Sequence, residues 1–248
     1  MLAASSAPTP LYGLYQSAWH FSPLTLTVVF SAYALALLAA LLSAGTLSDH
    51  VGRRPVLAGA LLAEAAAMLV FATARDVPAL IAARVLQGLA TGVATSAAGA
   101  ALLDVEDPRR PGRAAAVNGI APVAGMAVGV LAATALARYA PAPTHTVYVL
   151  LFLLFAAQAA VLPRTPETAR RHPGAWRSLR PAIALAPASR PVMALAAPGI
   201  VAAWALGGFY SSLGPSLARL IAPHAPQVTG GLVFFTLTAA AGLAGYTA

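Results

Sequence analysis

The sequence predicts an all-α protein, a polytopic transmembrane helix bundle. Of its 248 residues, 59% are hydrophobic and only 9% are charged, whereas soluble domains carry about 25% charged residues. Long apolar runs recur along the chain, separated by short breaks that contain arginine. Because so few charges cannot cover a globular surface in water, we expect the outer surface of the bundle to face lipid.

Seven of the apolar runs are long enough to cross a bilayer core, which takes about 20 residues of helix. They are residues 23–46, 55–73, 78–103, 113–137, 146–162, 191–217 and 229–248. A shorter apolar segment, residues 2–16, comes before them and is interrupted by Pro8 and Pro10. Glycine and proline inside the runs are compatible with helix, because neighbouring helices can satisfy the freed backbone groups.

These spans define the predicted domains. Residues 1–162 form a six-helix N-terminal bundle with an incomplete first helix, residues 163–190 form a cytoplasmic linker rich in arginine and proline, and residues 191–248 form the first two helices of a C-terminal bundle. Residues 175–186 of the linker fit either a short interfacial helix or a flexible segment. The short first segment and the unflanked last run lead us to expect a chain truncated at both ends; the alternative is a small protein with a re-entrant first segment.

The arginines indicate the orientation of the bundle. The chain has 15 basic residues, and all are arginine. The breaks after the second, fourth and sixth spans, counting the partial one, contain Arg53 and Arg54, then Arg109, Arg110 and Arg113, then Arg164, Arg170, Arg171, Arg177, Arg180 and Arg190. The opposite breaks contain Arg75, Arg138 and Arg219. Such alternation places the arginine-rich loops in the cytoplasm, so the net charge of +8 reports topology and not a nucleic-acid partner.

The break between the second and third spans combines residues of special chemistry. Gly45 removes a side chain where two helices approach, and Gly52 permits a tight turn. Asp49 places a carboxylate at the membrane edge, where a helix N-terminus or a neighbouring arginine would stabilise it. Arg53 and Arg54 can bind the anionic head groups of the bilayer. An ordinary charged loop would explain the arginines but not the whole spacing.

With Leu47 included, this string resembles the signature loop of the major facilitator superfamily, G-x-L-x-D-x-x-G-R-R, at every position. The family resemblance implies about twelve spans in two six-helix halves, which move against one another around a shared midmembrane site. It also implies that the signature loop acts as a cytoplasmic gate, with Asp49 as its latch. This chain would supply one nearly complete half and two helices of the other.

A second string lies in the fourth span, where Arg84, Gln87 and Gly88 are similar to the family's R-x-x-Q-G pattern. Arg84 lies roughly 9 Å below the outer surface at about 1.5 Å per helical residue. A guanidinium at this depth needs a partner or a wet cavity. The resemblance implies a role in proton coupling for this string. The alternative is a structural clamp, in which Arg84 binds backbone carbonyls of an adjacent helix.

Glu64 is the second intramembrane charge. It lies roughly 13 Å deep, near the midplane, and its alanine neighbours offer it no partner. Burial favours the neutral carboxyl, so Glu64 is a candidate proton carrier, and a neutral structural hydrogen bond is an equal alternative. The estimated depths of Glu64 and Arg84 differ by about 8 Å in a bilayer core of about 30 Å, so a direct ion pair is geometrically marginal and we expect their effects to be separate.

The fifth span departs from the pattern of drug antiporters in the resembled family. Gly125 and Gly129 are present and favour close helix packing, but the proline and the paired glycine of that pattern are missing. The candidates for the substrate cavity are Tyr33, Asn118 and Trp204, since the second, fifth and seventh spans can line the cavity in the family. Each of these side chains, taken alone, is more often a packing residue than a ligand contact.

The function that these observations predict is secondary active transport of a small solute across the cytoplasmic membrane by alternating access, coupled to protons. The alternatives are a scaffold or non-functional fragment derived from such a transporter, and an integral membrane enzyme. The sequence contains no H-E-x-x-H or G-x-S-x-G string, and its histidines lie at loops or span ends. We therefore expect no enzymatic activity, no catalytic residues, no metal and no cofactor.

Overall fold

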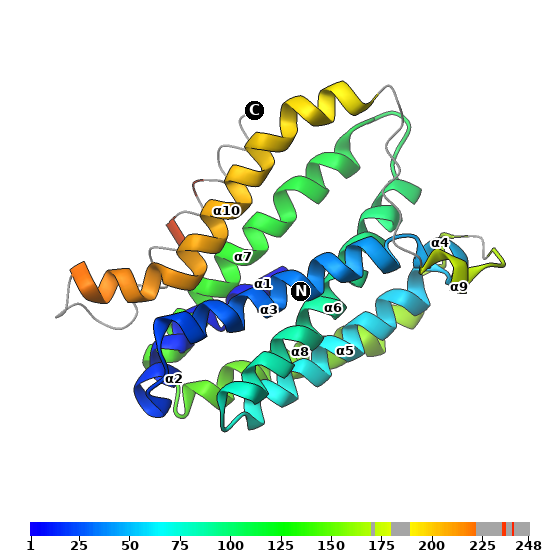
Figure 1. The fold of residues 1–248 in the computed structure, drawn as a ribbon. Helices are drawn as coiled ribbons and strands as arrows, with labels where there is room; N and C mark the ends of the chain where they lie inside the picture. The colour runs from blue at the N-terminus through cyan, green and yellow to red at the C-terminus, as the bar shows by residue number, and fades with distance from the viewer. Residues whose placement is uncertain (170–171, 180–188, 222–234, 237–239, 241–248) are drawn as a thin grey trace.

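The computed structural model describes residues 1–169, 172–179, 189–221, 235–236 and 240, and the regular elements among them are all helices (Figure 1). Six helices of this part are long and apolar enough to cross a membrane. They are α3 (Pro23–Ala44), α5 (Arg53–Thr73), α6 (Val77–Asp104), α7 (Arg113–Tyr139), α8 (Pro143–Val161, continued by the 3-10 turn η2, Leu162–Arg164) and α10 (Arg190–Ile221). The predicted all-α membrane bundle is confirmed.

The expected spans differ from these helices by a few residues at their ends. We expected the third span to begin at Pro55, but α5 begins at Arg53, because proline is tolerated anywhere in the first turn of a helix. Likewise α8 begins at Pro143 and not at residue 146. Most of the expected span 229–248 lies outside the described residues.

The first segment is helical but broken. It comprises α1 (Leu2–Ser6), the 3-10 turn η1 (Thr9–Leu11) and α2 (Tyr12–Trp19), so it extends three residues beyond the expected end at residue 16. The break coincides with Pro8 and Pro10, whose missing N–H groups cannot continue the helical ladder. Although this segment is short, it is enclosed by the bundle, since Ala4, Leu11 and Tyr12 are each at most 1% exposed.

Glycines bring the helices of the bundle into close contact. The most extensive contacts join α3 to α6, α5 to both α6 and α8, and α1 to α7. A Cβ atom on Gly88 of α6 would lie 2.4 Å from the Tyr33 carbonyl oxygen of α3, and one on Gly92 would lie 2.7 Å from the Leu37 carbonyl oxygen. Gly129 of α7 packs equally closely on α1, where Ala3 lies. These small residues allow the backbones to approach as in membrane helix pairs.

The outer surface of the bundle is apolar. Large hydrophobic side chains are exposed on every long helix, among them Leu35 of α3 at 66%, Leu62 of α5 at 59% and Leu195 of α10 at 86%. A soluble protein would rarely expose so much contiguous apolar surface. This apolar exterior is therefore suited to contact with the lipid chains of a bilayer.

Two short elements mark one end of the bundle. The α4 helix (Leu47–Val51) contacts α9 (Ala175–Ser178), and both lie where α5 begins and α6 ends (Figure 1). We call this the signature end. Of the residues for which an interfacial helix was considered, 175–178 are helical and 180–186 lie outside the described part. The opposite end contains α2, the connection between α5 and α6, and the start of α8.

The packing of α6 on α3 leads to a stability prediction. Gly92→Ala should destabilise the bundle by about 1–3 kcal/mol, because its methyl group would overlap the α3 backbone. The matched control is Gly59→Ala, since a Cβ at Gly59 of α5 meets nothing within 4 Å. This control should stabilise the protein by about 0.5–1 kcal/mol, because alanine has the better helix propensity. Thermal unfolding in detergent measures both; a stable Gly92→Ala variant would contradict the close packing.

Candidate functional site

At the signature end, Arg53 joins three parts of the chain. Its Nη1 atom donates hydrogen bonds to Asp49 Oδ1 of α4 and, at 2.7 Å, to Ser48 Oγ. Its Nε atom donates to Oδ2 of Asp104, the last residue of α6, at 3.0 Å. Only 12% of the Arg53 side chain is exposed. Asp49 thus has a neighbouring arginine, as expected, and Arg53 is engaged by protein groups and not turned out toward a lipid head group.

A carboxylate of the linker caps the same helix. Glu167 accepts hydrogen bonds from the backbone N–H groups of Arg53 at 2.8 Å and Arg54 at 3.1 Å, which are the unsatisfied donors at the start of α5. It also accepts from the N–H of Ala169 at 3.1 Å. The Arg54 guanidinium donates to the carbonyl oxygens of Pro163 and Thr165, both at 3.2 Å. The linker is therefore fastened to the signature loop by its backbone and by one acid.

Gly52 makes this contact sterically feasible. Its φ of +111° belongs to the region that favours glycine. A Cβ atom at this position would lie 2.7 Å from Glu167 Oε2, so a side chain would also displace the capping carboxylate. At Gly45, in contrast, a Cβ would meet the Leu41 carbonyl oxygen of the preceding turn at 2.7 Å, and the nearest atom of α6 only at 3.9 Å. Gly45 is therefore needed for the local turn after α3 and not, as we expected, for a close approach of two helices. Leu47 begins α4, two residues later.

The environment of Glu167 favours its ionised form. Partial desolvation raises the pKa of this carboxyl, but the N–H groups of Ala169, Arg53 and Arg54 together outweigh it and hold the pKa below its usual range. A depressed pKa means that the contact contributes stability above the usual carboxyl range and loses it only as the pH falls through the lowered value. The contact is therefore complete at neutral pH.

Sequence reasoning missed two acids of this end. Asp104, which accepts from Arg53, also accepts a hydrogen bond from Thr168 Oγ1 at 2.9 Å. Asp104 and Glu167 lie 51 and 114 residues from Arg53 along the chain. In the sequence, Asp104 is only an acid at the end of a span and Glu167 only an acid in a basic linker. Neither position identifies the arginine or the N–H group that the acid binds.

In the middle of the bundle, Arg84 is completely buried, at 0% exposure. Its Nε donates to the Tyr12 hydroxyl at 2.7 Å, and its Nη1 donates to the Ser5 carbonyl oxygen at 3.0 Å and to Gln87 Oε1 at 2.7 Å. Among the described residues no carboxylate lies within ion-pair distance of it. The contact with Ser5 is the backbone clamp that we considered as the alternative to a functional role.

Three aromatic rings surround the same guanidinium. Its Cζ atom lies 5.4 Å from the ring centroids of Tyr12 and Tyr33 and 5.6 Å from that of Phe71. Such contacts stabilise a desolvated cation by about 2 kcal/mol or more each. The rings come from α2, α3 and α5, so the burial of one charge joins three helices.

The proline break in the first segment supplies part of this site. Pro8 has no N–H, so the Ala4 carbonyl oxygen lacks the donor that a continuous helix would place four residues later. Gln87 Nε2 donates to this oxygen at 3.2 Å. The side chain of Gln87 therefore accepts from Arg84 with one atom and satisfies the broken helix with the other.

Glu64 lies beside this cluster and is also at 0% exposure. Its Oε1 atom accepts a hydrogen bond from the Thr91 hydroxyl of α6. Three buried polar atoms of this cluster have no hydrogen-bond partner in the described part of the chain, namely Glu64 Oε2, Arg84 Nη2 and the Tyr33 hydroxyl. Unpaired buried polar groups are rare and call for an explanation such as a bound water, ion or ligand. No hydrogen bond or ion pair between Glu64 and Arg84 is present in the described part of the chain.

The predicted residues divide between these two regions. Arg84, Gln87, Gly88, Glu64 and Tyr33 come together in the middle, and Gly45, Leu47, Asp49, Gly52, Arg53 and Arg54 at the signature end. Asn118 and Trp204 join neither: Asn118 is exposed on α7 beside Gly99, and Trp204 is 63% exposed on α10. Tyr12 and Thr91 of the middle region were missed, although Arg84, Gln87 and Thr91 are spaced to share one face of a helix.

No group of three or more histidine or acidic residues that could hold a metal ion occurs among the described residues. Within the described part of the chain, the middle region contains a buried cation without an ion-pair partner, a carboxyl that accepts one hydrogen bond, and unpaired donors and acceptors between four helices.

Comparisons with known proteins agree with this arrangement. The family model of the Major Facilitator Superfamily matches residues 1–248. The crystal structure of the human organic anion transporter MFSD10 (TETRAN) is similar, with a TM-score of 0.60 and 19% sequence identity, over 98% of this chain and 68% of that one. At this identity the likeness shows the fold alone. No curated protein sequence matches the chain.

The cap at the start of α5 can be tested by removing one charge. Glu167→Gln should loosen the linker, because a neutral amide is a weaker acceptor for the N–H groups of Arg53 and Arg54. Trypsin should then cleave faster after Arg164, which is exposed. The matched control is Glu106→Gln, since Glu106 accepts from the Ala114 N–H at the start of α7 in a different loop. Equal cleavage rates after Arg164 in the parent and both variants would show that Glu167 does not hold the linker.

Proposed function

Because the chain belongs to the major facilitator superfamily, we propose that this multi-pass membrane transporter is a secondary active transporter, which moves a small solute across the cytoplasmic membrane by alternating access. In this scheme two helix bundles move against one another around a midmembrane site. Coupling to a proton gradient supplies the driving force.

The observation that carries the proposal is the burial of Arg84 with no acid of the described residues in ion-pair contact. A buried charge is costly unless it is paired, so its retention in a helix core favours a use for it. The Arg84 guanidinium is held by Tyr12, Gln87 and a backbone carbonyl, while its Nη2 atom has no partner in the described part. A spare donor on a fixed cation suits an interaction that is made in only one state of the cycle. The contacts to Tyr12 and to the Ser5 carbonyl oxygen also make Arg84 a structural clamp on the first segment, so the functional role proposed here is additional to that one.

Glu64 is the proposed proton carrier. In this proposal a proton binds the unpaired Oε2 atom, while Thr91 continues to donate to Oε1. The neutral carboxyl tolerates burial, and the ionised carboxylate is favoured by the positive charge of Arg84 in the same region. Binding or release of the proton would thus change the charge balance around Arg84, where the solute is expected to act.

The signature end is the proposed cytoplasmic gate. Arg53 bonds α4 to the end of α6 through Asp49 and Asp104, and Glu167 ties the linker to the start of α5. Opening this end would require these charge-assisted contacts to break together. Their closure would favour the state that is shut toward the cytoplasm. Arg109, Arg110 and Arg113, which are exposed, are together with Arg54 the proposed partners of anionic head groups.

The solute path is assigned to the face of the bundle next to Arg84. Tyr33 is the candidate whose ring contacts the Arg84 cluster, and Asn118 and Trp204 remain candidates on exposed faces of α7 and α10. A small solute with hydrogen-bonding groups fits a region where unpaired polar atoms lie within aromatic walls. MFSD10 is an organic anion transporter, and we include organic anions among the solutes to be tested here.

The two intramembrane charges give the first functional prediction. The parent chain in proteoliposomes is screened with a radiolabelled panel of sugars, amino acids and organic anions to find a solute that accumulates under an imposed pH gradient. Glu64→Gln and Arg84→Gln should each abolish this accumulation, because the first removes the carboxyl that carries the proton and the second removes the fixed charge that responds to it. Solute exchange without a gradient should persist in both. Arg138→Gln, which neutralises an arginine at the end of α7, is the control. Gradient-driven accumulation at the parent level in both charge variants would leave only the structural roles.

The second prediction concerns orientation. The chain has no cysteine, so single cysteines can be placed at Arg110, in the loop between α6 and α7, and at Tyr139, which is 80% exposed at the other end of α7. A membrane-impermeant maleimide should label Tyr139→Cys in intact cells and Arg110→Cys only after permeabilisation. External labelling at position 110 would overturn the proposed topology.

A further inference from the structure

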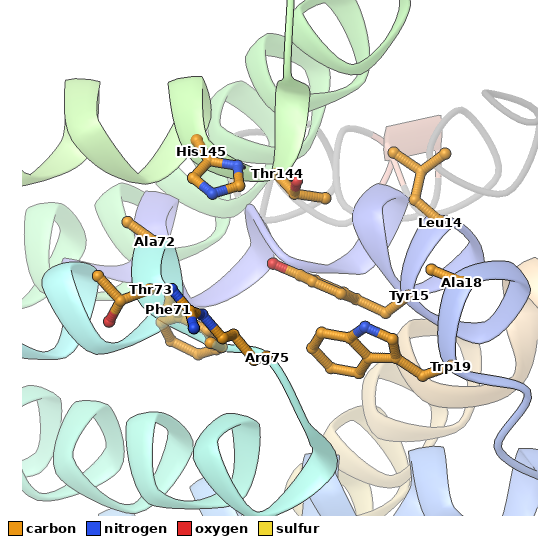
Figure 2. A pocket seen from close by; sticks show the side chains of 11 residues that line it. Leu14, Tyr15, Ala18, Trp19, Phe71, Ala72, Thr73, Arg75, Thr144 and His145 are labelled. Atoms are coloured by element: carbon orange, nitrogen blue, oxygen red, sulfur yellow. Dashed lines mark hydrogen bonds between the residues drawn. The ribbon is translucent and has the colours of Figure 1, made fainter.

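A pocket of about 490 Å³ opens at the end of the bundle opposite the signature loop. Its walls come from α2, the last turn of α5 and the start of α8, as Figure 2 shows. This volume lies in the range of small-molecule sites in proteins. Apart from Phe71, which also contacts Arg84, the lining belongs to neither the gate nor the Arg84 cluster, so it needs a separate explanation.

The pocket has an apolar, aromatic side. Leu14, Trp19 and Phe71 line it, and the rings of Tyr15 and Trp19 lie 4.8 Å apart. Aromatic faces of this kind hold flat or flexible apolar groups. Phe71 also lies beneath the Arg84 guanidinium, so its ring lies between the pocket and the midmembrane charge.

Two basic side chains also line the pocket, namely Arg75, which lies beside Phe71 just after α5, and His145 of α8 (Figure 2). Both side chains are exposed. Arg75 has no ion-pair partner in the part of the chain that the structure describes. The nearest acid in sequence, Asp76, is engaged in capping α6, since its Oδ1 accepts from the Ala79 N–H at 2.9 Å. The guanidinium therefore remains available to an anion.

A buried hydroxyl is aimed into the same space. Tyr15 is only 4% exposed, and its hydroxyl has no hydrogen-bond partner among the described residues. Figure 2 shows this hydroxyl pointing away from α2 toward the side of α5 and α8. The hydroxyl of Tyr148, which stacks on Phe71, also lacks a partner. Even a bond between the two phenols would leave one O–H donor unused, and a buried donor without a partner favours a ligand acceptor.

We propose that this pocket binds an amphipathic anion, with its carboxylate or phosphate between Arg75 and His145 and its apolar body against Trp19, Tyr15 and Phe71. The Tyr15 hydroxyl donates to a polar atom of the ligand. Two sources supply this chemistry, namely a free organic anion and an anionic lipid of the surrounding leaflet. The site does not depend on the proposed transport cycle, because none of its polar groups belongs to the gate or to the Arg84 cluster.

The test uses the full chain, purified and placed in phosphatidylcholine nanodiscs. Binding of radiolabelled phenylbutyrate is compared with that of phenylbutanol, which has the same ring but no charge. We expect saturable binding of phenylbutyrate, with phenylbutanol about tenfold weaker or more, since a charge-assisted hydrogen bond is lost. Arg75→Gln should weaken phenylbutyrate binding about tenfold and Tyr15→Phe about threefold to tenfold. Arg75→Lys should keep most of the affinity.

Arg138→Gln is the matched control, because Arg138 is an arginine at the same end of the bundle that does not line the pocket. It should bind phenylbutyrate as the parent does, and all variants should elute as single species with parental melting temperatures. Equal affinity for the two probes, or equal affinity of the parent, Arg75→Gln and Tyr15→Phe for phenylbutyrate, would overturn the proposal.

A further arm identifies the source. Phosphatidylglycerol is added to the nanodiscs, and phenylbutyrate binding is measured again. Competition that depends on Arg75 assigns the pocket to an anionic lipid, and undiminished binding assigns it to a free organic anion.

Discussion

The arrangement of this bundle depends on the burial of one arginine. Arg84 lies in α6 at 0% exposure. The groups that stabilise it come from the first segment, from α3, from α5 and from α6 itself. The broken first segment supplies a carbonyl oxygen and the Tyr12 hydroxyl, while α3 and α5 supply rings. Gly88 and Gly92 let α3 approach α6 closely enough for the Tyr33 ring to reach the guanidinium. In a continuous first helix the carbonyl oxygens would accept hydrogen bonds from the helix's own N–H groups. The proline break therefore makes these oxygens available to the buried Arg84 and to Gln87.

At the signature end, too, charged groups join segments that are far apart in the chain. There, charges lie at helix termini, where α5 exposes N–H groups and Arg53 reaches two carboxylates. Gly52 is required because its backbone has a positive φ and because Glu167 occupies the space of a side chain. We interpret the middle region as the site of coupling and this end as the gate, since one contains unpaired buried atoms and the other contains bonds that a moving bundle can break and remake.

Much of the fold could be predicted from the sequence, because span length and charge alternation are local properties. The class and the approximate limits of α3 and α5 to α8 required only a count of apolar residues. Partners were harder to predict. Tyr12, Asp104 and Glu167 pair with residues far away in the chain, and no local pattern encodes such a pairing. The cavity candidates Asn118 and Trp204 were chosen because their spans can line the cavity in the resembled family. That choice identifies a helix but not which face of the helix turns inward.

The central claim is that Arg84 holds the broken first segment in the bundle. Hydrogen–deuterium exchange of residues 1–19, read by mass spectrometry, tests it most directly by comparing the parent with Arg84→Gln. Exchange in this segment should rise about tenfold or more in the variant, since hydrogen bonds to a charged group contribute about 1.5–3 kcal/mol each. Peptides from α5 and α8 should exchange as in the parent. Unchanged exchange in residues 1–19 would contradict the account and show that the segment is held by apolar packing alone.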